Sequence, residues 1–143
     1  MNAGLVSGQD VPPEYVALVQ PHVDSFDYFL QDGMQLAVDS MEPLEIINPL
    51  TQAVTRYWFE DPHISKPIRE DAGPMASTKL MPSECRESGT TYKGPFSVKF
   101  CWSSEGGGEG SIVKRLGGLP IMTRSSACHL NGMSRSQLVS AKE

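Results

Sequence analysis

A regular alternation of apolar and polar side chains in the second half of the chain constrains the fold more than any other feature. From Thr90 to Trp102 the apolar positions are Tyr92, Phe96, Val98, Phe100 and Trp102, and the positions between them include Thr91, Ser97, Lys99 and Cys101. Successive side chains of a β-strand point to opposite faces of a sheet, so this pattern predicts a strand with one buried face.

A glycine-rich stretch follows this strand. Ser103–Ser111 contains Gly106-Gly107-Gly108 and predicts a flexible tip between two strands. Ile112–Leu116 and Leu119–Arg124 predict the returning strand, which is split by Gly117-Gly118. This part of the chain is therefore predicted to form a β-hairpin.

The N-terminal part of the chain has a helical pattern. Pro12-Pro13 followed by Glu14 predicts a helix start, because proline suits the first turn and an acid stabilises the positive end of the helix dipole. Pro21 is expected to interrupt this first short helix.

A stronger helix is predicted to follow, capped by Asp24 or Ser25 and ended by Pro43. Its apolar stripe, with spacings of three or four residues, consists of Val23, Phe26, Leu30, Met34 and Ala37. Gly33 weakens this helix by about 1 kcal/mol relative to alanine.

Shorter apolar runs between this helix and the central strand predict two further strands. Leu44–Ile47 is expected to pair with Ala53–Glu60 across a turn at Asn48-Pro49. Asp61–Pro82 is broken repeatedly by proline and glycine, so it is expected to be a long irregular connection on the surface or against a partner.

The two ends of the chain complete the prediction. Met1–Asp10 is small and polar and is expected to be a disordered lead. Ser134 is expected to cap a final helix, Arg135–Lys142. The predicted fold class is α+β, with N-terminal helices followed by an antiparallel or mixed sheet.

Length and composition favour a single domain in a reducing compartment. The chain has 143 residues, 39% of them hydrophobic, which is enough for one core. It has no run of about 18 apolar residues that would span a membrane, and Met1–Gln20 does not resemble a secretory signal. Cys85, Cys101 and Cys128 show no paired spacing and are expected to be reduced thiols.

Charge is distributed unevenly along the sequence. Residues 1–60 hold nine acidic residues and one basic residue, whereas residues 79–142 hold nine basic residues and four acidic ones. This asymmetry fits part of a large assembly, in which one face meets basic protein and the other tolerates a polyanion. The alternative is that both sets of charges only solvate the surface.

The glycines and cysteines do not form a ligand-binding motif. Gly106–Gly110 is not followed by the lysine and the serine or threonine of a phosphate-binding loop, which favours a solvated hairpin tip. Zinc sites require ligands in closely spaced pairs, and the three cysteines have no such spacing.

Cys128 is expected to be a small buried hydrophobe, and His129, which lies beside a turn, a surface or capping residue. A nucleophile pair of Cys128 with His22 or His63, as in a small cysteine-dependent enzyme, remains a weak alternative because nothing nearby in the sequence supports it.

The acids of the predicted helix do not indicate a metal site. Asp24, Asp27, Asp32 and Asp39 are expected to form its solvated face. The sequence contains no Asp-x-Asp pair of the kind that holds two catalytic metal ions. No catalytic residue, cofactor-binding residue or metal ligand is therefore predicted.

The basic residues of the hairpin are the one working surface that the sequence predicts. The candidates for contact with a nucleic-acid backbone are Lys93, Lys99, Lys114, Arg115 and Arg124. Such a cluster binds phosphate without reading base sequence, so any contact with DNA is expected to be weak and non-specific. The alternative is a basic strand edge that discourages aggregation.

Several short motifs occur together, in a consistent order, over nearly the whole chain. They are Pro21-His22-Val23-Asp24-Ser25-Phe26, Glu84-Cys85-Arg86, Thr91-Tyr92, Gly118-Leu119-Pro120-Ile121-Met122 and Ser125…Cys128…Leu130. The set resembles the N-terminal protrusion of the second-largest, β-type subunit of multisubunit DNA-directed RNA polymerases. Glu84-Cys85-Arg86 with Tyr92-Lys93-Gly94 and Trp102 is most similar to the RNA polymerase I subunit.

The resemblance implies a role in transcription. It implies a non-catalytic wall of the DNA cleft in an enzyme that makes ribosomal RNA in the nucleolus of the nucleus, with other polymerase subunits and DNA as partners and no small-molecule substrate for this part. Residues 11–143 are expected to be a partial protrusion domain, truncated at its C-terminal side. The parent enzyme is a nucleotidyltransferase whose Mg²⁺ and zinc belong to the rest of the complex. The alternative is a free-standing interaction protein that binds polymerase-assembly partners through the protrusion surface.

Overall fold

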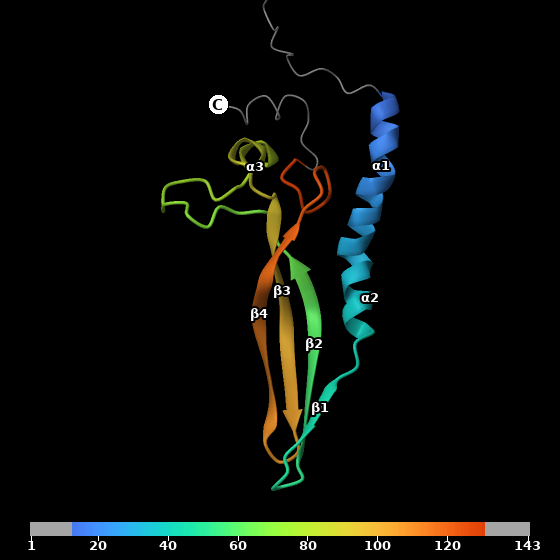
Figure 1. Cartoon of the computed structure of the whole chain (residues 1–143), viewed down its shortest axis with the longest axis vertical. Coiled ribbons are helices and arrows are strands. Elements are labelled where there is room, and N and C mark those ends of the chain that lie inside the picture. Colours follow the sequence, from blue (N-terminus) through green and yellow to red (C-terminus); the bar gives the residue numbers. More distant parts are fainter. Residues whose placement is uncertain (1–12, 131–143) are drawn as a thin grey trace, which may run out of the picture.

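The structure, a computed structural model, describes residues 13–130 and has an α+β fold, as predicted (Figure 1). Its elements in chain order are α1 (Pro13–Tyr28), the π-helical turn η1 (Phe29–Gly33), α2 (Met34–Asp39), β1 (Leu44–Ile47), β2 (Val54–Ile64), α3 (Pro82–Ser88), β3 (Lys93–Ser104) and β4 (Gly108–Pro120). The predicted lead at residues 1–10 and the predicted helix at 135–142 lie outside the described residues.

The four strands form one antiparallel sheet in the order β1-β2-β3-β4. The predicted pairing of the two shorter strands is confirmed, because Leu44 lies opposite Tyr57 and Ile47 opposite Val54. The connecting turn is closed by the side chain of Asn48, whose Oδ1 accepts the backbone N–H of Leu50 at 2.9 Å. This asparagine-closed turn is the local reason that the chain reverses here.

The β3–β4 hairpin is longer and more regular than predicted. The predicted tip at Ser103–Ser111 shrinks to a turn at residues 105–107, with Ser104 paired to Gly108. The predicted split at Gly117-Gly118 is also wrong. Strand β4 is continuous at this point. It contains one extra residue, Leu116, which forms a β-bulge between the pairs Phe96–Gly117 and Ser97–Arg115. Gly117 has a φ of 156°, which glycine adopts readily, so the strand bends without ending.

Aromatic side chains from β2 and β3 gather on one face of the sheet. Tyr57 lies opposite Trp102, and Phe59 lies opposite Phe100. The Tyr57 and Phe100 rings stack with their centroids 5.6 Å apart, and the Phe100 and Trp102 centroids are 6.1 Å apart. These cross-strand pairs stabilise the register of the two strands.

The helical segment runs alongside the sheet (Figure 1). Its residues Phe26 and Leu30 pack against the core cluster that includes Ile64, as does Phe96. Met34 is buried in the same cluster as Ile64.

The chain is helical from Pro13, the first residue that the structure describes, and Pro21 lies inside α1 and does not interrupt it. Residues 13–22 are exposed, so solvent is available to the carbonyl that the proline ring leaves without a helical donor.

A π-helical turn changes which residues of the helical segment face the sheet. The Met34 N–H donates to the carbonyl of Phe29, five residues earlier, instead of the usual four. The predicted stripe holds through Met34, but beyond it Val38 is half-buried and Ala37 is exposed. The wider turn inserts one residue and so shifts the stripe.

The segment between β2 and β3 contains more structure than predicted. β2 continues to Ile64 through a bulge after Glu60, where Asp61 takes a φ of 47°. Helix α3 was not predicted, although its signals are in the sequence. Pro82 occupies its first turn, Glu84 accepts the backbone N–H of Met81 at 2.7 Å, and Gly89 ends it with a φ of 68°.

The loop that follows β4 folds back into the core and contacts the helix. Cys128 is fully buried, as predicted. His129 is also buried, so of its two predicted roles, surface or capping residue, the surface placement is wrong. The backbone N–H of Ser126 donates to Asp27 Oδ1 at 2.6 Å. Asp27 therefore anchors the loop, and it is not part of a purely solvated helix face.

Candidate functional site

The titratable residues that the structure describes do not assemble into a metal centre. Among residues 13–130, no three His, Cys, Asp or Glu side chains are grouped in a way that could hold a metal ion. Cys85, Cys101 and Cys128 are all buried, unpaired thiols. No helix in this range is long and apolar enough to cross a bilayer.

The predicted basic residues divide between the two faces of the hairpin. Lys93 and Lys99 lie six residues apart on β3 and share one face with Arg115, which pairs with Ser97 on that face. Lys114 pairs with Val98 and so points to the aromatic face. Arg124 lies in the loop after β4, exposed and with a φ of 69°.

Among the residues that the structure describes, acidic partners engage two of these five cations. Lys99 Nζ lies 3.0 Å from Glu60 Oε2 and 3.7 Å from Asp61 Oδ2, and Arg115 forms an ion pair with Glu70. The hydrogen bonds from Trp58 and then from Lys99 lower the pKa of Glu60, and the contact with Glu60 raises the pKa of Lys99. The Arg115–Glu70 pair is exposed and the Lys99–Glu60 pair is half-buried, so both are reached by solvent and contribute little to stability.

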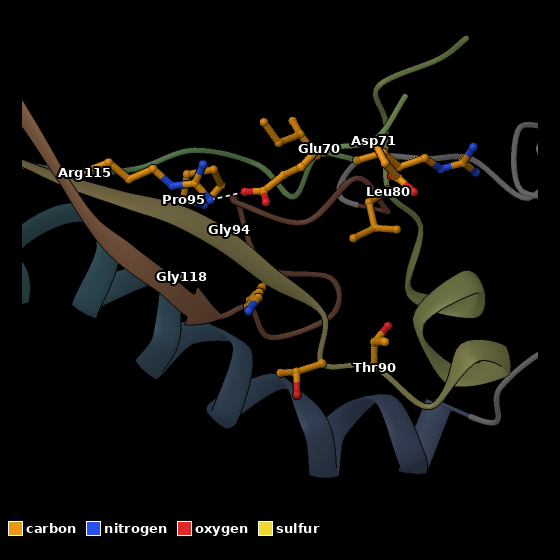
Figure 2. Close-up of a pocket in the computed structure, with 12 residues that line it drawn as sticks. Glu70, Asp71, Leu80, Thr90, Gly94, Pro95, Arg115 and Gly118 are labelled. Carbon is orange, nitrogen blue, oxygen red and sulfur yellow. Dashed lines mark hydrogen bonds and ion pairs between the residues drawn. The ribbon is translucent and has the colours of Figure 1, made fainter. Parts of the chain in front are cut away.

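A surface hollow of about 410 Å³ lies between the connection after β2 and the hairpin face that carries Lys93 and Arg115. Figure 2 shows the Glu70–Arg115 ion pair at one side of this hollow, with Leu80 and Thr90 toward the other. The hollow is lined by Ile68, Arg69, Glu70, Asp71, Leu80, Thr90, Thr91, Lys93, Gly94, Pro95, Arg115 and Gly118.

Two glycines shape the wall of the hollow. A Cβ at Gly118 would lie 2.9 Å from Lys93 Cδ, so the lysine side chain crosses the strand directly above this glycine. A Cβ at Gly94 would lie 2.1 Å from the carbonyl oxygen of Ser65, so only glycine permits the connection to approach β3 this closely. The sequence contains both glycines, but nothing in it predicted this packing.

A buried polar cluster holds the loop after β4 beside the hollow. The Tyr92 hydroxyl donates to Cys128 Sγ at 3.5 Å and accepts the backbone N–H of His129 at 3.1 Å. The His129 ring donates from Nε2 to the carbonyl of Pro67 at 2.6 Å. Burial raises the pKa of Tyr92, so the phenol remains a neutral donor. This cluster is structural, because its polar atoms are occupied by one another.

Comparison with known proteins finds a matching family and several similar proteins. Residues 17–143 match the family described as RNA polymerase beta subunit. The DNA-directed RNA polymerase I subunit rpa2 of Dictyostelium discoideum is 38% identical over 91% of this chain. The probable DNA-directed RNA polymerase I subunit RPA2 of Schizosaccharomyces pombe is 33% identical over 92% of it.

An archaeal protein also matches. The DNA-directed RNA polymerase subunit Rpo2N of Methanothermobacter thermautotrophicus, strain Delta H, is 34% identical over 88% of this chain. The chain covers 13% of the Dictyostelium protein, 12% of the Schizosaccharomyces protein and 24% of the archaeal one. The similarity therefore concerns a small part of each of these relatives.

Proposed function

Because the chain belongs to the RNA polymerase beta subunit family and corresponds to an N-terminal region of the second-largest subunit, we propose that it is the protrusion part of an RNA polymerase I second subunit. In this role it forms a wall of the DNA cleft during transcription of ribosomal RNA, in the nucleolus of the nucleus. The observation that carries the proposal is the match of residues 17–143 together with the 38% and 33% identity to two RNA polymerase I subunits.

The proposed contribution is structural. Nucleotidyl transfer by polymerases depends on clustered carboxylates that hold two metal ions. The described residues do not fit Mg²⁺ or zinc, since they contain no group of three potential ligands. Among the described residues, β3 and β4 are the longest strands and pair along nearly their whole length, which suits a wall.

Contact with DNA is proposed to be weak, non-specific and confined to phosphates. The residues proposed for it are Lys93, Lys99, Lys114, Arg115 and Arg124. The acid pairs on Lys99 and Arg115 support a weak contact, because phosphate has to compete with Glu60 and Glu70 there. The opposite orientations of Lys114 and Arg115 support a contact that uses only some of the five residues at once.

The proposal is tested in cells that carry a chromosomal affinity tag on the gene for this chain. Purification is expected to recover RNA polymerase I subunits, and chromatin immunoprecipitation is expected to enrich the ribosomal RNA genes over messenger RNA genes. Recovery of a different nuclear polymerase, with enrichment of its own genes, would contradict the assignment to polymerase I.

A free-standing interaction protein is the second candidate function. The first half of α1 favours it, because apolar side chains lie exposed there, Tyr15 at 55% and Leu18 at 69%. In the same purification, this candidate predicts polymerase-assembly partners without the largest polymerase subunit and without enrichment of any transcribed gene.

A further inference from the structure

We propose that the hollow between the connection after β2 and the β3–β4 hairpin is a docking site for a short acidic segment of a partner protein. One carboxylate of that segment would bind Lys93, and a neighbouring apolar side chain would pack against Ile68 and Leu80. Both the cation and the apolar residues line the hollow. This assignment does not depend on a role in transcription.

The lining of the hollow already binds carboxylates within the chain. Arg115 holds the carboxylate of Glu70, and Arg69 holds that of Glu84 (Figure 2 shows the first pair). Guanidinium groups favour carboxylates because their paired donors match the two oxygens. The intramolecular pairs therefore show the ligand chemistry that this surface accepts.

Lys93 is the cation of the hollow that the acids within residues 13–130 leave available. Among the described residues it forms no ion pair, whereas Arg69 and Arg115 each have one. The stem of Lys93 passes over Gly118, whose missing side chain leaves room for it. Thr91 is exposed on the same wall, and its hydroxyl suits hydrogen bonding to the backbone of an extended segment, whereas the Thr90 hydroxyl already hydrogen-bonds to Ser88 at 2.9 Å.

Inside the hollow, charge and polarity favour a protein segment over a nucleic acid, so a bound segment would compete with the weak DNA contact proposed above for Lys93. Glu70 and Asp71 lie at the hollow and would repel a row of phosphates more strongly than a single carboxylate, because each further negative charge adds to the repulsion. Ile68 is 42% exposed and Leu80 is half-buried, so apolar surface is available beside the cation. The volume of about 410 Å³ falls within the range of roughly 300–1,000 Å³ of ligand pockets.

The experiment selects peptides from a random heptapeptide phage library on the immobilised full-length chain. Selected peptides are expected to share an Asp or Glu next to an apolar residue. Their affinity, measured by fluorescence anisotropy, is expected to fall about tenfold or more in Lys93→Gln, because a charge-assisted hydrogen bond is lost.

Two further variants separate the effect of where the Lys93 side chain lies from the effect of overall positive charge. Gly118→Ala keeps every charge but displaces the Lys93 side chain, so it is expected to weaken binding severalfold. Arg86→Gln removes one positive charge from the exposed end of α3, outside the hollow, and is expected to leave binding unchanged. Circular dichroism of each variant establishes that the fold is retained.

Two results would overturn the proposal. One is the absence of acidic residues from the selected peptides, or peptides that bind Lys93→Gln as tightly as they bind the original chain. The other is a labelled 20-base-pair DNA duplex whose binding depends on Lys93 and Gly118 while no peptide is selected, since the hollow would then be a nucleic-acid surface.

Discussion

The indole ring of Trp102 lies directly over the α-carbon of Gly110 on the neighbouring strand. The two residues are register partners in the β3–β4 hairpin, and a Cβ at Gly110 would lie 2.3 Å from Trp102 Cζ2. Glycine at this position therefore allows the tryptophan to lie flat on β4 and to extend the aromatic row that begins at Tyr57 and Phe100.

Gly110→Ala is expected to lower the free energy of unfolding by about 1–3 kcal/mol, because the new methyl group forces the indole ring out of its place. Urea denaturation followed by tryptophan fluorescence measures the effect. Gly73→Ala is the matched control, since a Cβ there meets no atom within 4 Å. An equal effect of the two substitutions would rule out the contact with Trp102 as the cause.

Tyr92→Phe is expected to destabilise the fold by about 1–3 kcal/mol, because it removes the acceptor of the buried His129 N–H and the donor to Cys128 Sγ. Thermal and urea denaturation measure the loss. Tyr28→Phe changes the same atom on a ring that is 57% exposed and is expected to have little effect. A stable Tyr92→Phe protein would show that another group satisfies the His129 N–H.

The carboxylate of Glu60 is expected to titrate below the ordinary glutamate range, because it accepts hydrogen bonds from Trp58 Nε1 at 2.8 Å and from Lys99 Nζ at 3.0 Å. NMR titration of its side-chain carbon measures the pKa. Trp58→Phe is expected to raise this pKa, whereas Trp102→Phe, on the opposite face, is expected to leave it unchanged.

The lowered pKa of Glu60 also determines how the stability of the fold changes with pH. Because the pKa of Glu60 is lower in the folded chain, its stabilising contribution is present above the unfolded value and is lost as the pH falls through the folded value. Glu60→Gln is therefore expected to weaken the loss of stability between neutral and acid pH. An unchanged acid dependence in this variant would show that other carboxylates determine it.

Binding to duplex DNA is expected to weaken steeply with salt. Two to four phosphate contacts predict a slope of about −2 to −4 in a plot of log affinity against log salt concentration, measured by fluorescence anisotropy. The double reversal Lys114→Glu with Arg115→Glu is expected to abolish binding. Each single reversal tests one face of the hairpin, since the two side chains point in opposite directions. A DNA affinity that does not change with salt concentration would show that the basic residues serve only to protect the strand edge from aggregation.

Local patterns in the sequence were enough to determine much of the fold. The alternation through Phe96, Val98 and Phe100 specified a strand because the side-chain period of a strand is two residues. Pro13 followed by Glu14 indicated a helix, which the structure has in α1, and Asn48 marked the turn between β1 and β2. The motifs that indicated a polymerase subunit are also local, and the family match confirms them.

The tertiary structure alone decided which side chains meet across the chain. Asp27 receives its hydrogen bond from Ser126, and Arg115 its ion pair from Glu70, although each pair is far apart in sequence. The burial of His129 likewise depends on the carbonyl of Pro67. A local sequence pattern reflects how side chains repeat along one helix or strand, whereas these contacts depend on how the helices, strands and loops pack together. For the same reason, the hollow beside Lys93 exists only in the folded chain.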